Sequence, residues 1–92
     1  RPLCTFVVST SLSINNTWKT CLDSYGLRGT IIKKIADIEN IKQGEFVLIT
    51  FNMLIKYKKQ IKKFIKLKVK WLTLTVVTRY NVMNVKKRIN RG

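Results

Sequence analysis

Apolar residues fall in several short runs along this chain, and most of these runs have the composition of β-strands. A first strand is predicted over residues 4–14, CTFVVSTSLSI, where Ser and Thr separate β-branched residues. A second is predicted over residues 27–38, LRGTIIKKIADI, because most of its apolar residues are β-branched. A third is predicted over residues 45–55, EFVLITFNMLI, which is apolar enough to be buried on both faces.

Turn-forming residues separate these runs. Asn and Thr at positions 15–17 predict a turn after the first strand. DSYG at positions 23–26 predicts a β-turn, with Asp opening it and Gly closing it. NIKQG at positions 40–44 predicts a tight connection into the third strand.

The hydrophobic period changes within residues 58–77, KKQIKKFIKLKVKWLTLTVV. Ile61, Phe64 and Ile65 have helical spacing, but residues 65–71 alternate between apolar residues and lysines, as in a strand. The alternation shifts by one position at Trp71, which predicts a β-bulge there. We therefore expect a basic loop or short helical turn that leads into a long strand ending at Val77.

Together these segments predict a mainly β fold for a single small domain of 92 residues, 1–92. The expected architecture is a small five-stranded β-barrel, complete or incomplete, formed by residues 4–81. Residues 82–92 are polar and basic and predict an extension that orders only against a partner.

Charge is high and unevenly placed. The 19 Lys and Arg residues outnumber the 4 Asp and Glu residues, for a net charge of +15, and no carboxylate follows Glu45. Such an imbalance indicates a polyanionic partner, either nucleic acid or anionic lipid. No apolar run reaches the ~18 residues of a membrane-spanning helix.

The sequence offers little for catalysis or cofactor binding. It has no His, no phosphate-binding glycine motif and no cluster of metal ligands. Asp37 and Glu39 are interpreted as partners of nearby lysines. Cys4 and Cys21 do not form a CxxC pair, so free or buried thiols are expected, with a disulfide as the alternative. We predict a protein that is not an enzyme and uses no cofactor, metal or small-molecule substrate.

A dense strip of eight lysines between positions 56 and 70 is the main candidate for phosphate binding, because no acid near it in sequence balances its charge. Tyr57 and Tyr80 are candidates for base stacking, whereas Phe64 and Trp71 are expected in the core. The candidate RNA-binding residues are Arg28, Lys33, Lys34, Lys56, Lys58, Lys59, Lys62, Lys63, Lys66, Lys68, Lys70, Arg79, Lys86, Lys87, Arg88 and Arg91.

Three segments in order resemble the universal large-subunit ribosomal protein L-fourteen family. They are DSYGLRGTIIKKI at 23–35, QGEFVLITF at 43–51 and VKWLTLTVVTRYN at 69–81. Asp23, Gly26 and Arg28 fit the first family element, Gly44 and Glu45 the second, and Arg79 falls near an arginine of the third. Ser24 and Tyr25 depart from the family pattern, and its C-terminal portion has no counterpart here.

The resemblance implies a structural protein of the large ribosomal subunit that binds ribosomal RNA and neighbouring ribosomal proteins. A separate polypeptide that completes the fold is a further expected partner. The Ile-, Lys- and Asn-rich composition and the basic, Ser/Thr-rich N-terminal residues favour a mitochondrial ribosome. Two alternatives are a free RNA-binding translation factor or RNA chaperone with an oligonucleotide-binding barrel and, less favoured, a cationic amphipathic membrane-binding protein.

Overall fold

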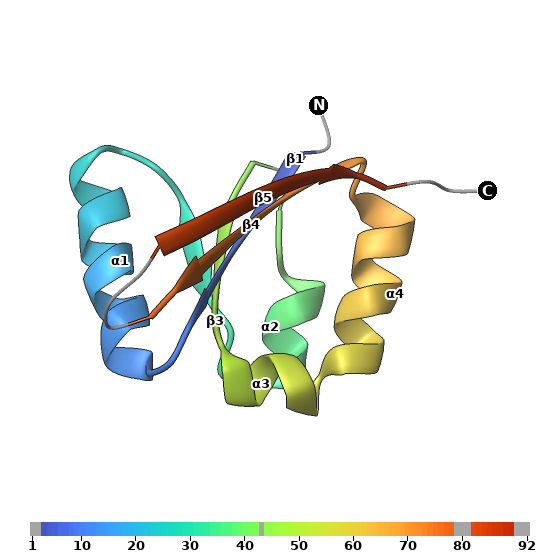
Figure 1. Cartoon of the computed structure of the whole chain (residues 1–92), viewed down its shortest axis with the longest axis horizontal. Coiled ribbons are helices and arrows are strands. Elements are labelled where there is room, and N and C mark those ends of the chain that lie inside the picture. Colours follow the sequence, from blue (N-terminus) through green and yellow to red (C-terminus); the bar gives the residue numbers. More distant parts are fainter. Residues whose placement is uncertain (1–2, 43, 79–81, 90–92) are drawn as a thin grey trace.

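A five-stranded open sheet with helices on both faces forms this domain (Figure 1). The computed structural model describes residues 3–42, 44–78 and 82–89. The strands are β1 (Leu3–Ser9), β2 (Gly29–Ile31), β3 (Phe46–Thr50), β4 (Trp71–Val77) and β5 (Val82–Arg88). The helices are α1 (Leu12–Ser24), α2 (Ile35–Glu39), α3 (Phe51–Lys56) and α4 (Lys58–Lys68).

The sheet is not closed, so the predicted barrel over residues 4–81 does not form. The strand order is β2-β3-β1-β4-β5, which leaves β2 and β5 at the two edges. β1, β2, β3 and β4 are parallel, and only β5 runs antiparallel to its neighbour. The sheet has five strands, as predicted, but the fifth is β5, which lies in residues expected to form an extension. The fold is not mainly β, because parallel neighbours need crossover connections, and helices supply them here.

Helix α1 occupies residues that the sequence pattern assigned to a strand and a turn. β1 ends at Ser9, and the hydroxyl of Ser11 caps α1 by accepting a hydrogen bond from the Ile14 amide at 3.4 Å. Ile14, Trp18 and Leu22 recur every four residues and pack against the sheet. The turn predicted at residues 15–17 is therefore wrong, because these residues lie inside the helix.

The turn predicted at residues 23–26 is confirmed at the end of α1. The Gly26 amide donates to the Asp23 carbonyl at 3.1 Å, and Gly26 has a φ of 70°. The strand predicted over residues 27–38 is much shorter, because β2 contains only Gly29–Ile31. It is followed by the short helix α2, and the Asp37 carboxylate of this helix accepts hydrogen bonds from the amides of Lys33 and Lys34, which come just before the helix.

The apolar run at residues 45–55 is also shared between a strand and a helix. β3 ends at Thr50, whose hydroxyl caps α3 by accepting a hydrogen bond from the Met53 amide at 3.3 Å. Val47, Leu48 and Ile49 are fully buried, as expected for a strand covered on both faces. The prediction is therefore correct for the strand and wrong for its length.

One long strand with a bulge was predicted up to Val77. A helix, α4, and a separate strand, β4, form there instead. The helical spacing of Ile61, Phe64 and Ile65 continues through Lys68, and β4 begins at Trp71. β4 pairs with β1 in unbroken register from Leu3 opposite Trp71 onward, so no bulge forms. The shift in alternation marks the boundary between a helix and a strand.

The C-terminal residues form an edge strand rather than an unpaired extension. β5 pairs with β4 over its whole length, with Val77 opposite Val82. A hydrogen bond of 2.7 Å between the Thr75 hydroxyl and Asn84 Oδ1 adds to the pairing. Every residue of β5 is exposed, because no described element covers either of its faces.

Two apolar cores lie on opposite faces of the sheet. On one face, Val7, Leu48 and Val77 pack under α1. On the other face, buried strand residues pack under α2, α3 and α4. These strand residues are Cys4, Phe6, Val8, Val47 and Ile49. Successive residues of each strand therefore point to opposite faces of the sheet and belong to different cores.

We predict that Asp37 stabilises the fold at neutral pH and that this contribution is lost in acid. Its carboxylate accepts hydrogen bonds from the amides of Lys33 (2.9 Å) and Lys34 (3.1 Å), and mainly the first of these lowers the pKa of Asp37 below 3.8. A lowered folded-state pKa gives stability that is present above the unfolded pKa and lost as the pH falls through the folded pKa.

Urea unfolding of Asp37→Asn is expected to show lower stability than wild type at pH 7 and a smaller difference at pH values below the folded pKa of Asp37. Glu39→Gln is the matched control, since it removes the same charge from the same helix. An equal loss in both variants at pH 7 would contradict the prediction.

Candidate nucleic-acid interface

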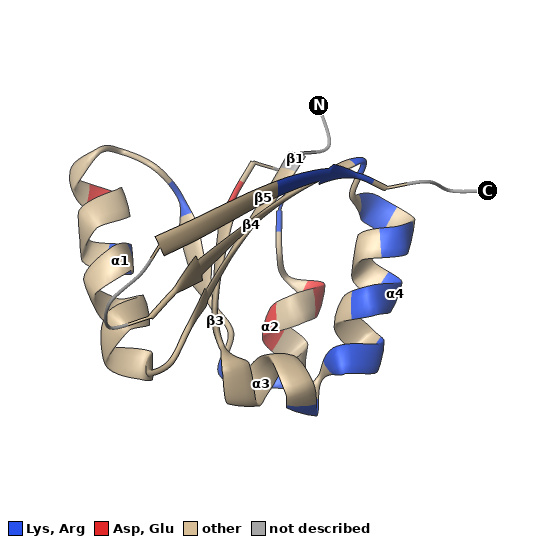
Figure 2. Cartoon of the chain, in the orientation of Figure 1, with Lys and Arg blue, Asp and Glu red and all other residues tan. Residues whose placement is uncertain are grey.

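Helix α4 presents a row of lysines to solvent. Its inner side is fixed by Ile61, which is 3% exposed, and by the half-buried Phe64 and Ile65. Lys59, Lys62, Lys63 and Lys66 occupy the opposite side, which we call the lysine face. Figure 2 shows this positive charge along the whole helix, which spans about 16 Å at 1.5 Å per residue.

A second basic group lies where β4 begins and β5 ends. Arg88 is opposite Trp71 in the ladder, and the Ile89 amide donates to the Lys70 carbonyl at 2.8 Å, so Lys70 and Arg88 are close in space. The ammonium group of Lys86 lies 5.3 Å from the centre of the Trp71 ring. Together with Lys87, these residues extend the basic surface along one end of the sheet (Figure 2).

The remaining predicted basic residues are spread over other parts of the surface. Lys33 and Lys34 follow β2, and Lys56 ends α3, so all three lie near the carboxyl ends of the parallel strands. Arg28 precedes β2, at the amino end of these strands, and its carbonyl accepts the Phe46 amide at 2.9 Å. The predictions for Arg79, Tyr80 and Arg91 lie outside the described residues.

The aromatic side chains are arranged differently from the sequence prediction. Tyr57 is half-buried against the α4-side core, with the Lys56 ammonium 5.5 Å from its ring centre. Phe64 packs in the same core, as predicted. Trp71 is half-buried on the sheet face that α1 leaves uncovered near β5, beneath Lys86. The sequence did not indicate this site because β5 was not predicted.

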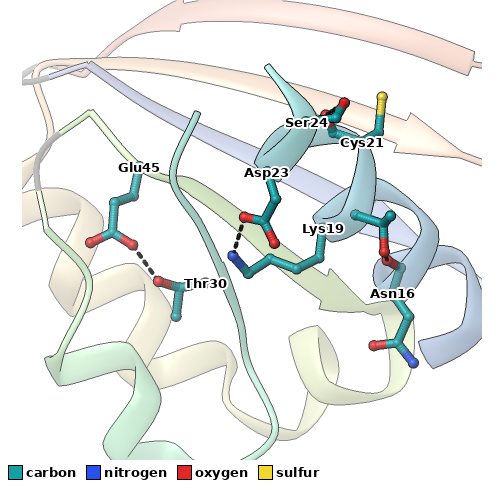
Figure 3. A network of polar contacts seen from close by, with 8 residues as sticks. Asn16, Lys19, Cys21, Asp23, Ser24, Thr30 and Glu45 are labelled. Atoms are coloured by element: carbon teal, nitrogen blue, oxygen red, sulfur yellow. Dashed lines mark hydrogen bonds and ion pairs between the residues drawn. The ribbon is translucent and has the colours of Figure 1, made fainter. Parts of the chain in front are cut away.

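The acidic residues form contacts elsewhere in the fold (Figure 3). Lys19 and Asp23 form an ion pair at 2.6 Å on the exposed side of α1. The buried Glu45 accepts hydrogen bonds from the Thr30 hydroxyl and from the Lys42 amide. Within residues 3–42, 44–78 and 82–89, no ion pair links an acid to a lysine of α4. Glu39 comes nearest, as it lines a hollow shared with Lys63 and Lys68.

A buried polar pair closes the carboxyl end of the central strand β1. The Ser9 hydroxyl lies 2.5 Å from Asn15 Oδ1 and 2.9 Å from the Ser11 carbonyl, so it joins β1 to the first turn of α1. Asn15 is fully buried, and its Nδ2 has no hydrogen-bond partner among the described residues. Because Asn15 was predicted to lie in a turn, this pair was not expected from the sequence.

Comparison of the chain with family models, curated proteins and solved structures gave no match. No helix in the described part of the chain is long and apolar enough to cross a membrane.

The two cysteines are free and sit in contrasting environments. Cys4 is buried in the α4-side core, and burial, with a smaller effect from the charge of Glu45, raises its pKa to about 12. Cys21 is exposed on α1 (Figure 3). The alternative of a disulfide between them is not what forms.

We predict that one thiol reacts rapidly in the native protein and that the second reacts only after unfolding, because the thiolate is the reactive form. Titration with a chromogenic disulfide reagent at pH 8 should show a fast phase that Cys21→Ser removes and Cys4→Ser preserves. Two equally fast thiols, or none before reduction, would contradict the assignment.

Proposed function

We propose that this chain is a nucleic-acid-binding domain whose principal contact is the lysine face of α4, with RNA as its partner. The proposal rests on the two sides of α4: packing fixes the inner side, and on the outer side no lysine forms an ion pair with an acid in the described part of the chain. The buried Ile61 holds the helix against the sheet, so the lysines project outward in a fixed row. Lysine binds phosphate as a point charge and needs no base-specific geometry.

The basic group at the end of β4 and β5 supports the same function. Lys70 follows α4 in the sequence, and Arg88 lies close to Lys70 at the same end of the sheet. Trp71 and Lys86 add a ring and an ammonium group at this end, which suits an unpaired base next to a phosphate. Trp71, Lys86 and Arg88 face the α1 side of the sheet, so a partner that lies along α4 has to pass around this end of the sheet to contact both groups.

The family resemblance favours a specific target, which is the RNA of the large subunit of the mitochondrial ribosome. Neighbouring ribosomal proteins would be further partners. The support is the order of three sequence elements, which fall on the end of α1 with β2, on β3 and on β4. The family's small barrel gives no support, since the sheet here is open.

The two alternatives have less support. A translation factor or RNA chaperone with an oligonucleotide-binding barrel requires a closed sheet, which this chain does not form. A membrane-binding amphipathic helix must offer its apolar side to lipid. In α4, that side is occupied by contacts with the sheet through Ile61, Phe64 and Ile65.

We predict that Lys63→Gln combined with Lys66→Gln weakens RNA binding and lowers its salt dependence. Each lost phosphate contact reduces the slope of log affinity against log salt by about 0.9 on a duplex, so the double variant should lose about 1.8. Fluorescence anisotropy with a labelled RNA hairpin, over a range of KCl concentrations, measures the slope directly.

The matched control is Lys19→Gln combined with Lys42→Gln, which removes the same charge from α1 and from the segment between α2 and β3, at residues that are not RNA-binding candidates. Its slope should stay near the wild-type value. Equal losses in the two double variants would show that net charge, rather than the lysine face, governs binding.

The ribosomal target has its own test. A tagged chain expressed in its own host is expected to sediment with the large mitochondrial subunit and to remain there at high salt, as an integral ribosomal protein does. Release at modest salt, with RNA binding by the lysine face retained, would exclude the ribosome and keep the nucleic-acid function.

A further inference from the structure

An apolar groove of about 390 Å³ lies beside α4, on the helix-covered face of the sheet. Its apolar lining comes mainly from Phe6, Ile55, Ile61, Ile65, Leu72 and Leu74. Two lysines, Lys58 and Lys62, form part of its wall. The groove is therefore an apolar floor with positive charge along its α4 side.

Strand β5 extends the apolar floor. Its register places Val85 opposite Leu74 and Met83 opposite Val76, so the side chains of Val85 and Met83 share the groove's face of the sheet. Both are strongly exposed, at 48% for Val85 and 58% for Met83, and Ile55 at the other end of the groove is 72% exposed. A continuous exposed apolar surface of this kind is typical of an interaction site.

The dimensions of this surface suit one additional helix. Neighbouring strands lie about 4.8 Å apart and packed helices about 8–10 Å apart, so one helix covers about two strands. On this face, α2 and α4 lie side by side, and no described element lies beyond α4. The uncovered width is that of β4 and β5, which is the place of one more helix in the layer.

We propose that the groove binds an acidic amphipathic helix of a partner protein. Lys58 and Lys62 line its α4 side, and Lys87 shares its face on β5, opposite Leu72. A helix with an apolar stripe between rows of Asp or Glu would place its carboxylates next to cations on both sides. A second copy of this chain is a poor occupant, because its net charge is +15 and its four acids lie outside α4 and β5.

The groove is distinct from the RNA surface. Lys59, Lys63 and Lys66 point away from it, and only Lys62 belongs to both surfaces. This separation makes it possible to change one surface and leave the other intact.

The test uses a synthetic fluorescein-labelled helical peptide that carries Leu at i, i+3, i+4 and i+7 and Glu on both flanks. Its control is a peptide of the same composition in scrambled order, which keeps the charge and loses the stripe. The ordered peptide is expected to bind about tenfold more tightly than the scrambled one, measured by anisotropy. Equal affinities would overturn the proposal, since charge alone would explain binding.

Two variants locate the binding site. Ile55→Glu and Val85→Glu each place a negative charge on the groove surface, which repels the glutamates of the peptide. Each variant should weaken binding of the ordered peptide by about tenfold. Leu67→Glu is the matched control, because Leu67 is 64% exposed and lines the hollow between α2 and α4 instead. All three residues are largely exposed, so the variants should fold, and circular dichroism checks this. Equal effects in all three would overturn the proposal.

Other occupants are separate outcomes of the same set of experiments. If Ile55→Glu weakens binding of the RNA hairpin as much as binding of the peptide, the groove belongs to the nucleic-acid surface. If sedimentation velocity shows a dimer that Ile55→Glu dissociates, the groove binds a second copy. Either result would overturn the proposal, whereas unchanged RNA affinity and a monomer support it.

Discussion

Burial of the central strand β1 is the constraint on which the rest of this structure depends. Phe6, Val7 and Val8 are at most 2% exposed, and β1 is hydrogen-bonded to parallel strands on both sides. A parallel strand in this position needs helical crossovers and a covering layer on each face. α1 supplies one layer, and α2, α3 and α4 supply the other. The position of α4 follows from this requirement, and so does the direction in which its lysines point.

The lysine face is energetically unfavourable for an isolated helix and is stabilised by the sheet beneath it. Like charges four residues apart, such as Lys59 with Lys63 and Lys62 with Lys66, cost about 0.2–0.5 kcal/mol per pair. Lys58 and Lys59 at the amino end also oppose the helix dipole, whereas Lys66 and Lys68 at the carboxyl end favour it. Burial of Ile61 contributes about 1.5–3 kcal/mol, which is of the same size as these losses, and the partly buried Phe64 and Ile65 add to it. Packing therefore decides that α4 is a helix, and not propensity or charge.

The sequence predicted which segments are buried better than it predicted whether each segment is a strand or a helix and where it ends. The cores of β1, β3 and β4 and the turn at Gly26 were identified from β-branched runs and turn residues. The errors arose where one apolar run serves a strand and then a helix, as at Thr50, because a short helix adds too few turns to show its period. The capping residues Ser11 and Thr50 were the available signals. At the site, the sequence correctly indicated that the lysines are exposed. The position of Trp71 beneath Lys86 could not be predicted, because it depends on the register of β5, and the composition of this segment indicated an unpaired tail.

The positions of the acidic residues explain why positive charge is densest on α4 and β5. Asp23 pairs with Lys19, Asp37 binds the two backbone amides that precede α2, and Glu45 binds Thr30 of β2. The first two contacts are local, and the third joins β2 to the residue before β3. Glu39 lines the hollow beside Lys63 and Lys68 but forms no ion pair with a described residue of α4. The α4 and β5 side also carries the apolar groove, so this half of the sheet combines an excess of positive charge with uncovered apolar surface. A polyanion on α4 would relieve the lysine repulsion and stabilise the folded state by mass action. The half with the fewest internal neutralising contacts is therefore the half whose stability should depend most on a bound partner.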